Sequence, residues 1–160
     1  MGDPRKQRRK YTRPKHPWRS ERIEAENELC KKYGLKNKTE VWRAISTLRG
    51  FRQQARKLLG MPDDEDTKKE AKKLLDKLNK RSIINTISLD DVLSLTIEGV
   101  LERRLQTLVC RRGIANTMKQ ARQLIIHGKV KVGGKVINVP RYPVSKAEED
   151  TIQLVTPEGG

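Results

Sequence analysis

Lysine and arginine are the residues of this sequence best placed to do chemistry, and what their charges do best is bind phosphate. The chain of 160 residues carries 36 Lys and Arg against 20 Asp and Glu, a formal net charge of +16. A charge this positive opposes compaction unless a polyanion neutralises it. Nucleic acid and acidic membrane surfaces are the two obvious polyanions. No apolar run approaches the roughly 20 residues of a bilayer-spanning helix, so the pattern favours nucleic acid and no membrane.

The other reactive side chains are few and scattered. The chain has two cysteines, Cys30 and Cys110, and two histidines, His16 and His127. Their spacing matches no metal site, so we expect neither zinc nor any other cofactor. The cysteines lie far apart in helical patterns and are expected to be reduced thiols. No nucleophile–base pair is recognisable, which predicts a binding protein and not an enzyme.

A helix is predicted to begin near residue 101 and to stop before Gly113, because apolar residues recur there at helical spacing. At about 100° per residue, Arg104, Thr107 and Arg111 fall on one flank of the apolar stripe. We therefore expect these three side chains to face the same partner. The stripe itself consists of Leu101, Leu105, Leu108 and Val109.

A second helix is predicted after Thr117, which stands three residues before Gln120 at the spacing of a capping box. Lys119, Arg122 and Gln123 lie beside one another on its outer side. This helix therefore presents a polar, basic side to its surroundings. Its expected buried face consists of Met118, Ala121, Leu124 and Ile125.

After this helix the hydrophobic period changes to two, so residues 129–139 predict a β-hairpin. The pair Gly133-Gly134 is the expected two-residue turn. Lys129 and Lys131 share one strand face, and the valines that follow each of them share the other, core-facing side. The hairpin therefore extends the basic side of the second helix.

A third strand over residues 151–155 is predicted to complete a small twisted sheet, after an irregular connection over residues 140–150. Two helices packed on this sheet place seven basic residues near one rim, which is suited to RNA geometries where two phosphate strands converge. The seven are Arg104, Arg111, Arg112, Lys119, Arg122, Lys129 and Lys131.

Three further residues of this rim are candidate RNA contacts. The hydroxyl of Thr117 and the helix N-terminus behind it can donate to a phosphate. Gln123 lies beside the basic residues of the same helix. For His127, a helix-end residue bonded to backbone and an RNA contact are equally compatible with the pattern.

Residues 23–100 predict short, charged helices with no strand-rich pocket. The longest, over residues 41–59, carries basic residues on the faces that its apolar stripe leaves free, and their number in an already basic protein favours RNA contact. These candidates are Arg43, Arg49, Arg52 and Arg56. Further helices are expected over residues 21–33 and 68–80. The predicted helix caps are Ser20, Asn37, Thr67, Ser88 and Thr96.

Residues 1–22 form a basic segment with nine basic and two acidic side chains. Its prolines prevent a continuous helix, and it lacks the apolar stretch of a secretory signal, which favours a cytoplasmic protein. A solvated tail and an arm that orders against phosphates are both compatible with this composition. We favour the arm, because aromatic residues that stack on bases are interleaved with the charge. Its candidate contacts are Arg8, Arg9, Lys10, Arg13 and Trp18.

The sequence thus predicts an α+β protein in three segments. These are a basic extended arm over residues 1–22, a helical domain over residues 23–100, and a module of two helices and a small twisted β-sheet over residues 101–160. We expect the last segment to be inserted into the helical domain or packed on it. The net charges of residues 1–60 and 101–160 are both positive, whereas residues 61–100 carry seven basic and nine acidic side chains.

The module resembles the "S four" RNA-binding domain through nearly sixty residues of continuous pattern. The matching residues are Arg104-Leu105, Gly113-Ile114-Ala115, Thr117, Gln120 to Ile125, His127 to Val130 and Val132 to Gly134. The rest of the chain is similar to the small-subunit ribosomal protein S four family in its archaeal and eukaryotic form. The motifs are YTRPKHPWRSER, KYGLKNK, VWR, RKLL and LDDVLSLT.

This resemblance implies a structural constituent of the small ribosomal subunit in the cytoplasm. Such proteins bind a helix junction in the five-prime domain of small-subunit rRNA, nucleate assembly and support translational accuracy. The implied partners are small-subunit rRNA, a neighbouring ribosomal protein of the S five family, and mRNA where it enters the subunit.

Three positions depart from the family pattern, and two alternatives remain open. The usual acid is replaced by Gln106, the usual Arg by Met118 and the usual Asn by Gly133. Lys119 is the candidate to replace the missing Arg as a phosphate contact. The alternatives are an rRNA-processing factor of the nucleolar type and, less favoured, the RNA-binding part of an RNA-modifying enzyme.

Overall fold

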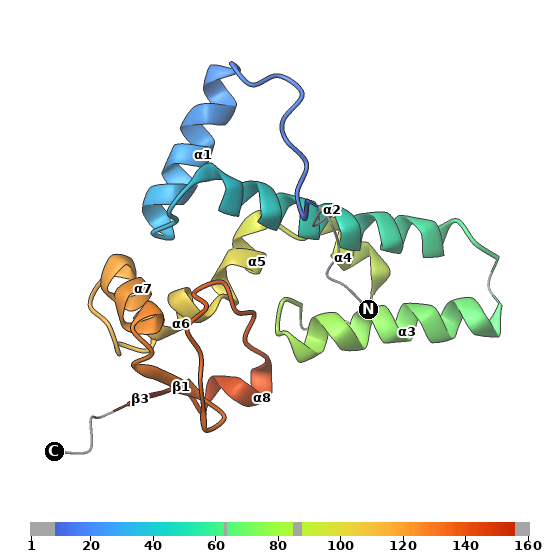
Figure 1. Ribbon diagram of the computed structural model, residues 1–160. Coiled ribbons are helices and arrows are strands. Elements are labelled where there is room, and N and C mark those ends of the chain that lie inside the picture. The colour runs from blue at the N-terminus through green and yellow to red at the C-terminus, as the bar shows by residue number, and fades with distance from the viewer. Residues whose placement is uncertain (1–8, 63, 85–87, 156–160) are drawn as a thin grey trace, which may run out of the picture.

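The structure is a computed structural model that describes residues 9–62, 64–84 and 88–155. In Figure 1 the long helix α2 extends across the molecule, and α1 and α3 pack against it. The module, described over residues 101–155, lies at one end. The helices before the module are α1 (Ser20–Lys32), α2 (Lys38–Leu59), α3 (Glu65–Lys80), α4 (Leu89–Ser94) and α5 (Ile97–Glu102). None of the described helices is both long and apolar enough to cross a membrane.

The helices pack along one buried face of α2. The larger of the two clusters in the helical region joins this face to α3, α4 and the turn after α3. A smaller cluster of Tyr33, Ala44 and Leu101 continues toward the module. The members of the larger cluster are Leu48, Phe51, Ala55, Leu58, Leu74, Leu78, Ile84, Val92 and Leu95. Apolar burial of this kind contributes about 25 cal/mol per Å², so α2 holds the helical region together.

The module consists of α6 (Leu105–Arg111), α7 (Met118–Ile126), β1 (Val130–Val132), β2 (Lys135–Val136), α8 (Lys146–Glu149) and β3 (Gln153–Leu154). Its antiparallel sheet has the order β2-β1-β3. The glycine pair of the predicted turn has positive φ at both positions, 57° and 77°, which a right-twisted two-residue hairpin requires. These features confirm the predicted α+β fold and its hairpin.

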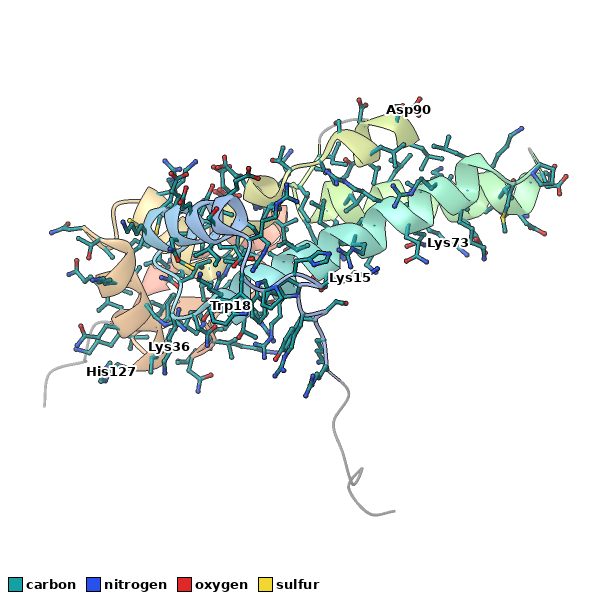
Figure 2. All side chains as sticks on the ribbon, turned by 90° about the horizontal axis from the view of Figure 1, so that it is seen from above. Lys15, Trp18, Lys36, Lys73, Asp90 and His127 are labelled. Atoms are coloured by element: carbon teal, nitrogen blue, oxygen red, sulfur yellow. The ribbon has the colours of Figure 1, made fainter. Side chains whose placement is uncertain are left out.

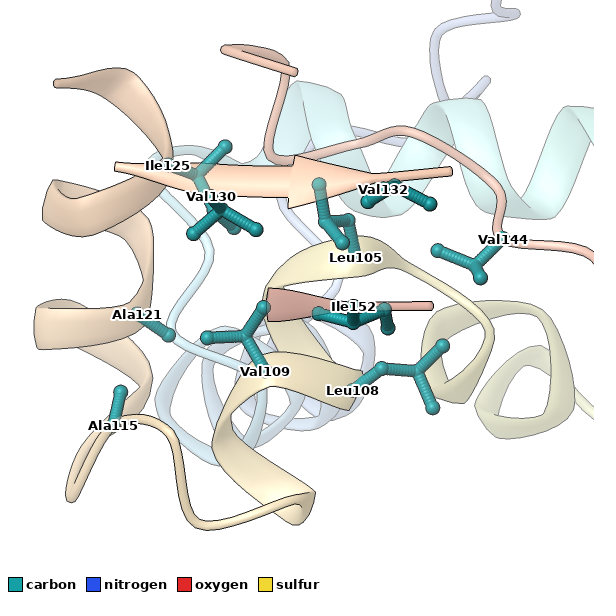
Figure 3. Close-up of a cluster of buried hydrophobic side chains, with 10 residues drawn as sticks. All are labelled: Leu105, Leu108, Val109, Ala115, Ala121, Ile125, Val130, Val132, Val144 and Ile152. Carbon is teal, nitrogen blue, oxygen red and sulfur yellow. The ribbon is translucent and has the colours of Figure 1, made fainter. Parts of the chain in front are cut away.

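The core of the module lies between helices α6 and α7 and the sheet (Figure 3). It contains both inward-facing valines of β1, while the lysines that alternate with them are exposed, as predicted. Val144 and Ile152 from the last segment close the far side. The division of the chain at residues 22 and 100 stays an interpretation.

The helix predicted from residue 101 to residue 112 is wrong as one element. α5 ends at Glu102 and α6 begins at Leu105, with Arg103 and Arg104 between them. The segment 140–144 pairs with this break: Leu105 N–H donates to the Tyr142 carbonyl at 2.9 Å and Val144 N–H to the Arg103 carbonyl at 3.0 Å. A single helix would have left no free backbone groups here for that pairing.

Three smaller differences concern helix ends and the last connection. α3 begins at Glu65, before the predicted cap Thr67, whose hydroxyl instead donates to the Asp64 carbonyl. Ser20 is the first residue of α1 and makes no cap bond. The connection predicted as irregular contains α8, opened by a capping box between Ser145 and Glu148. Asn37, Ser88 and Thr117 do accept backbone N–H groups as predicted.

Candidate nucleic-acid interface

Glu40, in the first turn of α2, connects the helical region to the module. Its Oε2 accepts a hydrogen bond from Arg104 at 2.6 Å, and its Oε1 accepts one from Arg122 of α7 at 2.8 Å. The side chains of Glu40 and Arg104 are 12% and 7% exposed, so this pair is screened little by water. Burial alone raises the pKa of Glu40, but the hydrogen bonds from Arg122 and Arg104 outweigh it and hold the pKa below its ordinary value.

Gln106 makes a second connection beside this ion pair. Its side-chain amide donates to the carbonyls of Gly34 at 3.0 Å and Met118 at 2.9 Å, and its oxygen accepts from Arg122 at 3.3 Å. A carboxylate has no proton to donate to two carbonyls. Gln106, which stands where the family usually has an acid, can therefore connect α7 to the loop after α1, whereas an ionised acid could not.

Gly34 allows that contact to be close. Its φ is +57°, and a Cβ placed on it would lie 2.6 Å from the Cβ of Met118. Met118, the second departure from the family pattern, is thus a packing residue at the same place as Gln106. We call the group formed by Gly34, Glu40, Arg104, Gln106, Met118 and Arg122 the joint.

The joint corrects the expectation for Arg104. Arg104 and Thr107 are buried, whereas Arg111 is exposed, so these three do not form one surface. The helix break explains the position of Arg104, because the predicted flank assumed one continuous helix across residue 104. Arg122 is half-buried and directed at Glu40.

The remaining predicted contacts of the module lie at its surface. Arg111 lies 3.7 Å from Glu102, and Arg112 pairs with Asp150 at 2.7 Å. The others are exposed on α7, the residues flanking it and β1. In Figure 2 His127 lies on the side of the molecule opposite to Asp90. We call this exposed set the α7–hairpin surface: Thr117, Lys119, Gln123, His127, Lys129 and Lys131.

Some of the predicted RNA contacts on α2 are exposed to solvent, and another makes a contact within the fold. Arg49 and Arg56 are exposed. Arg52 is half-buried and donates to the Leu95 carbonyl, so it ties α2 to the end of α4. These three arginines line one shallow pocket of about 420 Å³. Two of its arginines are free to approach a polyanion while the third anchors the wall.

The arm contacts α2 at Tyr11 and Thr12 and then arches away to the start of α1 (Figure 1). Thr12 N–H donates to the Ser46 hydroxyl at 3.1 Å. The Tyr11 ring contacts two neighbouring residues of α2, with the ring centroid of Trp42 6.0 Å away and the guanidinium of Arg43 at 5.7 Å. Tyr11 is therefore not free to stack on a base.

The arm nevertheless presents several of its predicted contacts to solvent. Trp18 is 90% exposed, the most exposed of the large apolar side chains. Arg9, Lys10 and Arg13 are also exposed, and Arg8 lies outside the described residues.

Three arginines that the sequence patterns did not single out complete the basic surface. Arg81 follows α3, Arg103 lies in the break before α6, and Arg141 lies in the connection after β2. They meet Arg43 of α2 around one cleft. Positions so far apart in sequence leave no local signal of this meeting. The pairing of segment 140–144 with residues 103–106 places Arg141 beside Arg103, and the packing of α3 on α2 brings Arg81 to the same cleft.

The described residues contain no cluster of three or more potential metal ligands. Cys30 and Cys110 are both free. Burial raises the pKa of the Cys30 thiol, which makes it a poor nucleophile at neutral pH. The chemistry available to this surface is therefore charge, hydrogen bonding and stacking.

Both the module and the chain as a whole match known proteins. Residues 103–152 match the S4 domain. The chain is 54% identical over 153 residues to the small ribosomal subunit protein uS4 of Methanothermobacter thermautotrophicus, covering 95% of this chain and 89% of the relative. It is 53% identical over 157 residues to that of Methanococcus aeolicus, covering 97% and 88%. The corresponding protein of Saccharolobus islandicus is 52% identical over 154 residues, covering 95% and 84%.

The matched span covers at least 95% of the chain, so the similarity is not limited to the RNA-binding domain. These relatives are structural and not enzymatic components of the ribosome, which argues against the alternative of an RNA-modifying enzyme. The chain belongs to the small ribosomal subunit protein uS4 family, whose members are structural proteins of the ribosome that bind rRNA.

Proposed function

We propose that this protein binds a helix junction in the five-prime domain of small-subunit rRNA, where it nucleates assembly and supports translational accuracy. The observation that carries this proposal is the distribution of exposed basic residues over arm, α2, α7 and hairpin, all on a framework that the joint holds in one arrangement. A junction brings several phosphate backbones together. A surface of several basic patches fits it better than a single groove does.

The α7–hairpin surface and the arm supply different parts of this binding. Lysines that extend into solvent neutralise phosphates without reading sequence. Trp18 offers an exposed ring on which an unpaired base can stack, worth about 1–3 kcal/mol per base. Arg111 and Arg112 exchange their exposed carboxylate partners for phosphates at little cost, because such surface pairs contribute about 0–1 kcal/mol.

The proposed location is the cytoplasm, on the ribosome. The proposed protein neighbour is a member of the S five family, near the place where mRNA enters the subunit. Both come from the resemblance to the family.

The test is fractionation of native lysate on a sucrose gradient, followed by binding of the purified chain to transcribed rRNA fragments. We expect the protein in the small-subunit fractions and a preference for the five-prime domain fragment over fragments of other domains. Absence from small subunits, or equal affinity for all fragments, would contradict the proposal. The same gradient distinguishes a processing factor, which would sediment with precursor particles and not with mature subunits.

A further inference from the structure

A cleft of about 460 Å³ lies where the arm, α2, the end of α3 and the segment 140–143 meet. Its floor is apolar and includes Ala44, Phe51 and Leu101. Its walls carry Lys10, Arg43, Arg81, Arg103, Arg104 and Arg141. We propose that this cleft receives a single nucleotide of the bound RNA, with the phosphate against the arginines and the base on the apolar floor. This inference rests on the proposed function and deepens it by naming where one nucleotide is held.

The first argument is charge. Among the described residues, Glu40 is the one acidic side chain in the lining, and Arg104 and Arg122 already occupy both of its oxygens. Arg103 pairs with Glu149, which lies outside the lining, at 2.7 Å, but the structure pairs none of Lys10, Arg81 and Arg141 with a carboxylate, as far as the described residues extend. Cations gathered in a concave site without counter-charge raise the local concentration of anions. The cleft is therefore prepared for an anionic group.

The second argument is hydrogen bonding. Five described arginines keep a buried Nε without an acceptor, and three of them, Arg43, Arg103 and Arg104, line the cleft. Buried donors without partners are rare in folded proteins, and each needs a water, an ion or a function to explain it. Guanidinium groups bind phosphate in a bidentate manner and also stack on flat rings. A bound nucleotide supplies both a phosphate and a ring.

The third argument is the combination of size and polarity. The volume lies within the range of about 300–1,000 Å³ that small-molecule sites occupy. A floor of Phe51 and aliphatic side chains gives a phosphate ion nothing to bind, whereas the face of a base is apolar. The cleft is bordered by α2 on one side and by segment 140–143 of the module on the other. The cleft therefore depends on the joint, which holds the module against the helical region.

Thr47 offers a way to fill the cleft without changing its charge. It lines the cleft from α2 and is exposed, and its hydroxyl donates to the Arg43 carbonyl at 2.9 Å. Thr47→Trp places a large ring in the cleft, and Thr47→Ala removes the same hydroxyl without filling it. The charge variant is Arg81→Gln with Arg141→Gln. Its matched control is Lys72→Gln with Lys73→Gln, two exposed lysines of α3 outside the cleft.

The experiment measures the Kd of the full chain for the transcribed five-prime domain of small-subunit rRNA at fixed salt, with thermal unfolding of each variant as the check on folding. We expect Thr47→Trp and the Arg81/Arg141 variant to weaken binding at least tenfold. The Thr47→Ala and Lys72/Lys73 variants are expected to stay within about threefold of the unmodified protein. If Thr47→Trp lowers the unfolding temperature, the charge variant decides.

Two failures are distinguishable. If the unmodified protein binds the five-prime domain and both cleft variants bind it as their controls do, the cleft inference is wrong and the proposed function stands. If the unmodified protein shows no preference for this domain, the proposed function itself is wrong, and the cleft inference falls with it.

Discussion

The joint and the α7–hairpin surface use the same kinds of side chain for opposite purposes. In the joint, Arg104 and Arg122 face one carboxylate and are withdrawn from solvent. On the α7–hairpin surface, Lys129 and Lys131 are exposed and have no acid opposite them among the described residues. Positive charge in this family member is thus divided between holding the framework and binding the polyanion. Burial, and not residue type, decides which role a cation takes.

Removing the carboxylate of the joint is expected to have the largest effect. Glu40→Ala leaves Arg104 buried without its partner, and losing one member of a buried pair costs about 3–5 kcal/mol. Denaturant unfolding should show this loss in the free energy of unfolding. A loss below about 1 kcal/mol would mean that the pair is solvated and that the two regions differ less than the structure indicates.

Crowding the joint should come next. Gly34→Ala adds a Cβ where Met118 already lies and forces an alanine to keep a positive φ. Strain of both kinds costs about 1–3 kcal/mol. In a Met118→Gly background, which removes the Cβ that an alanine at residue 34 would meet, the cost of Gly34→Ala should be smaller in the same unfolding assay. Gly113→Ala is the control, because its φ is also positive but its Cβ meets nothing within 4 Å.

The amide of Gln106 is expected to have a smaller, more specific effect. Gln106→Glu places a carboxylate oxygen against the carbonyls of Gly34 and Met118, which leaves buried acceptors unsatisfied at a cost of about 1–3 kcal/mol. Gln106→Met keeps the volume and lacks the charge. If both variants unfold at the same denaturant concentration as the unmodified protein, the joint does not require the amide as a donor.

Acid should weaken the joint but not the α7–hairpin surface. The pKa of Glu40 lies below its ordinary value of 4.5 in the folded protein, so its contribution is complete above that value. It is lost as pH falls through the lower, folded value. Glu148, held by the backbone and side chain of Ser145, contributes in the same sense. Glu40→Gln should therefore flatten part of the loss of stability below pH 4.5, and Glu148→Gln a separate part.

Much of the module could be predicted from sequence because its signals are local. The capping residue Thr117, the glycine turn and the alternation of Lys and Val each act within a few residues. The break at residues 103–104 could not be predicted, because it depends on pairing with segment 140–144, almost forty residues away. The buried role of Arg104 follows from that break and from Glu40, which lies 64 positions earlier.

The chemical character of the candidate site could be predicted from the sequence, but only some of its residues could. The exposed lysines of the α7–hairpin surface lie where their strand and helix positions indicate. The arginines at residues 81, 103 and 141 were missed, because only the tertiary fold brings them to one cleft. Replacing Arg104, Arg111 and Arg122 together, the natural test from sequence, would confuse binding with loss of the joint.

The most direct test compares Arg104→Gln with Lys131→Gln in one experiment on full-length protein, rRNA five-prime domain and a series of salt concentrations. We expect Lys131→Gln to keep the unfolding temperature and to reduce the slope of log affinity against log salt by about 0.7–0.9. Arg104→Gln should lower the unfolding temperature and leave that slope unchanged. If instead Arg104→Gln reduces the slope with stability intact, Arg104 is an RNA contact and the division between joint and binding surface is wrong.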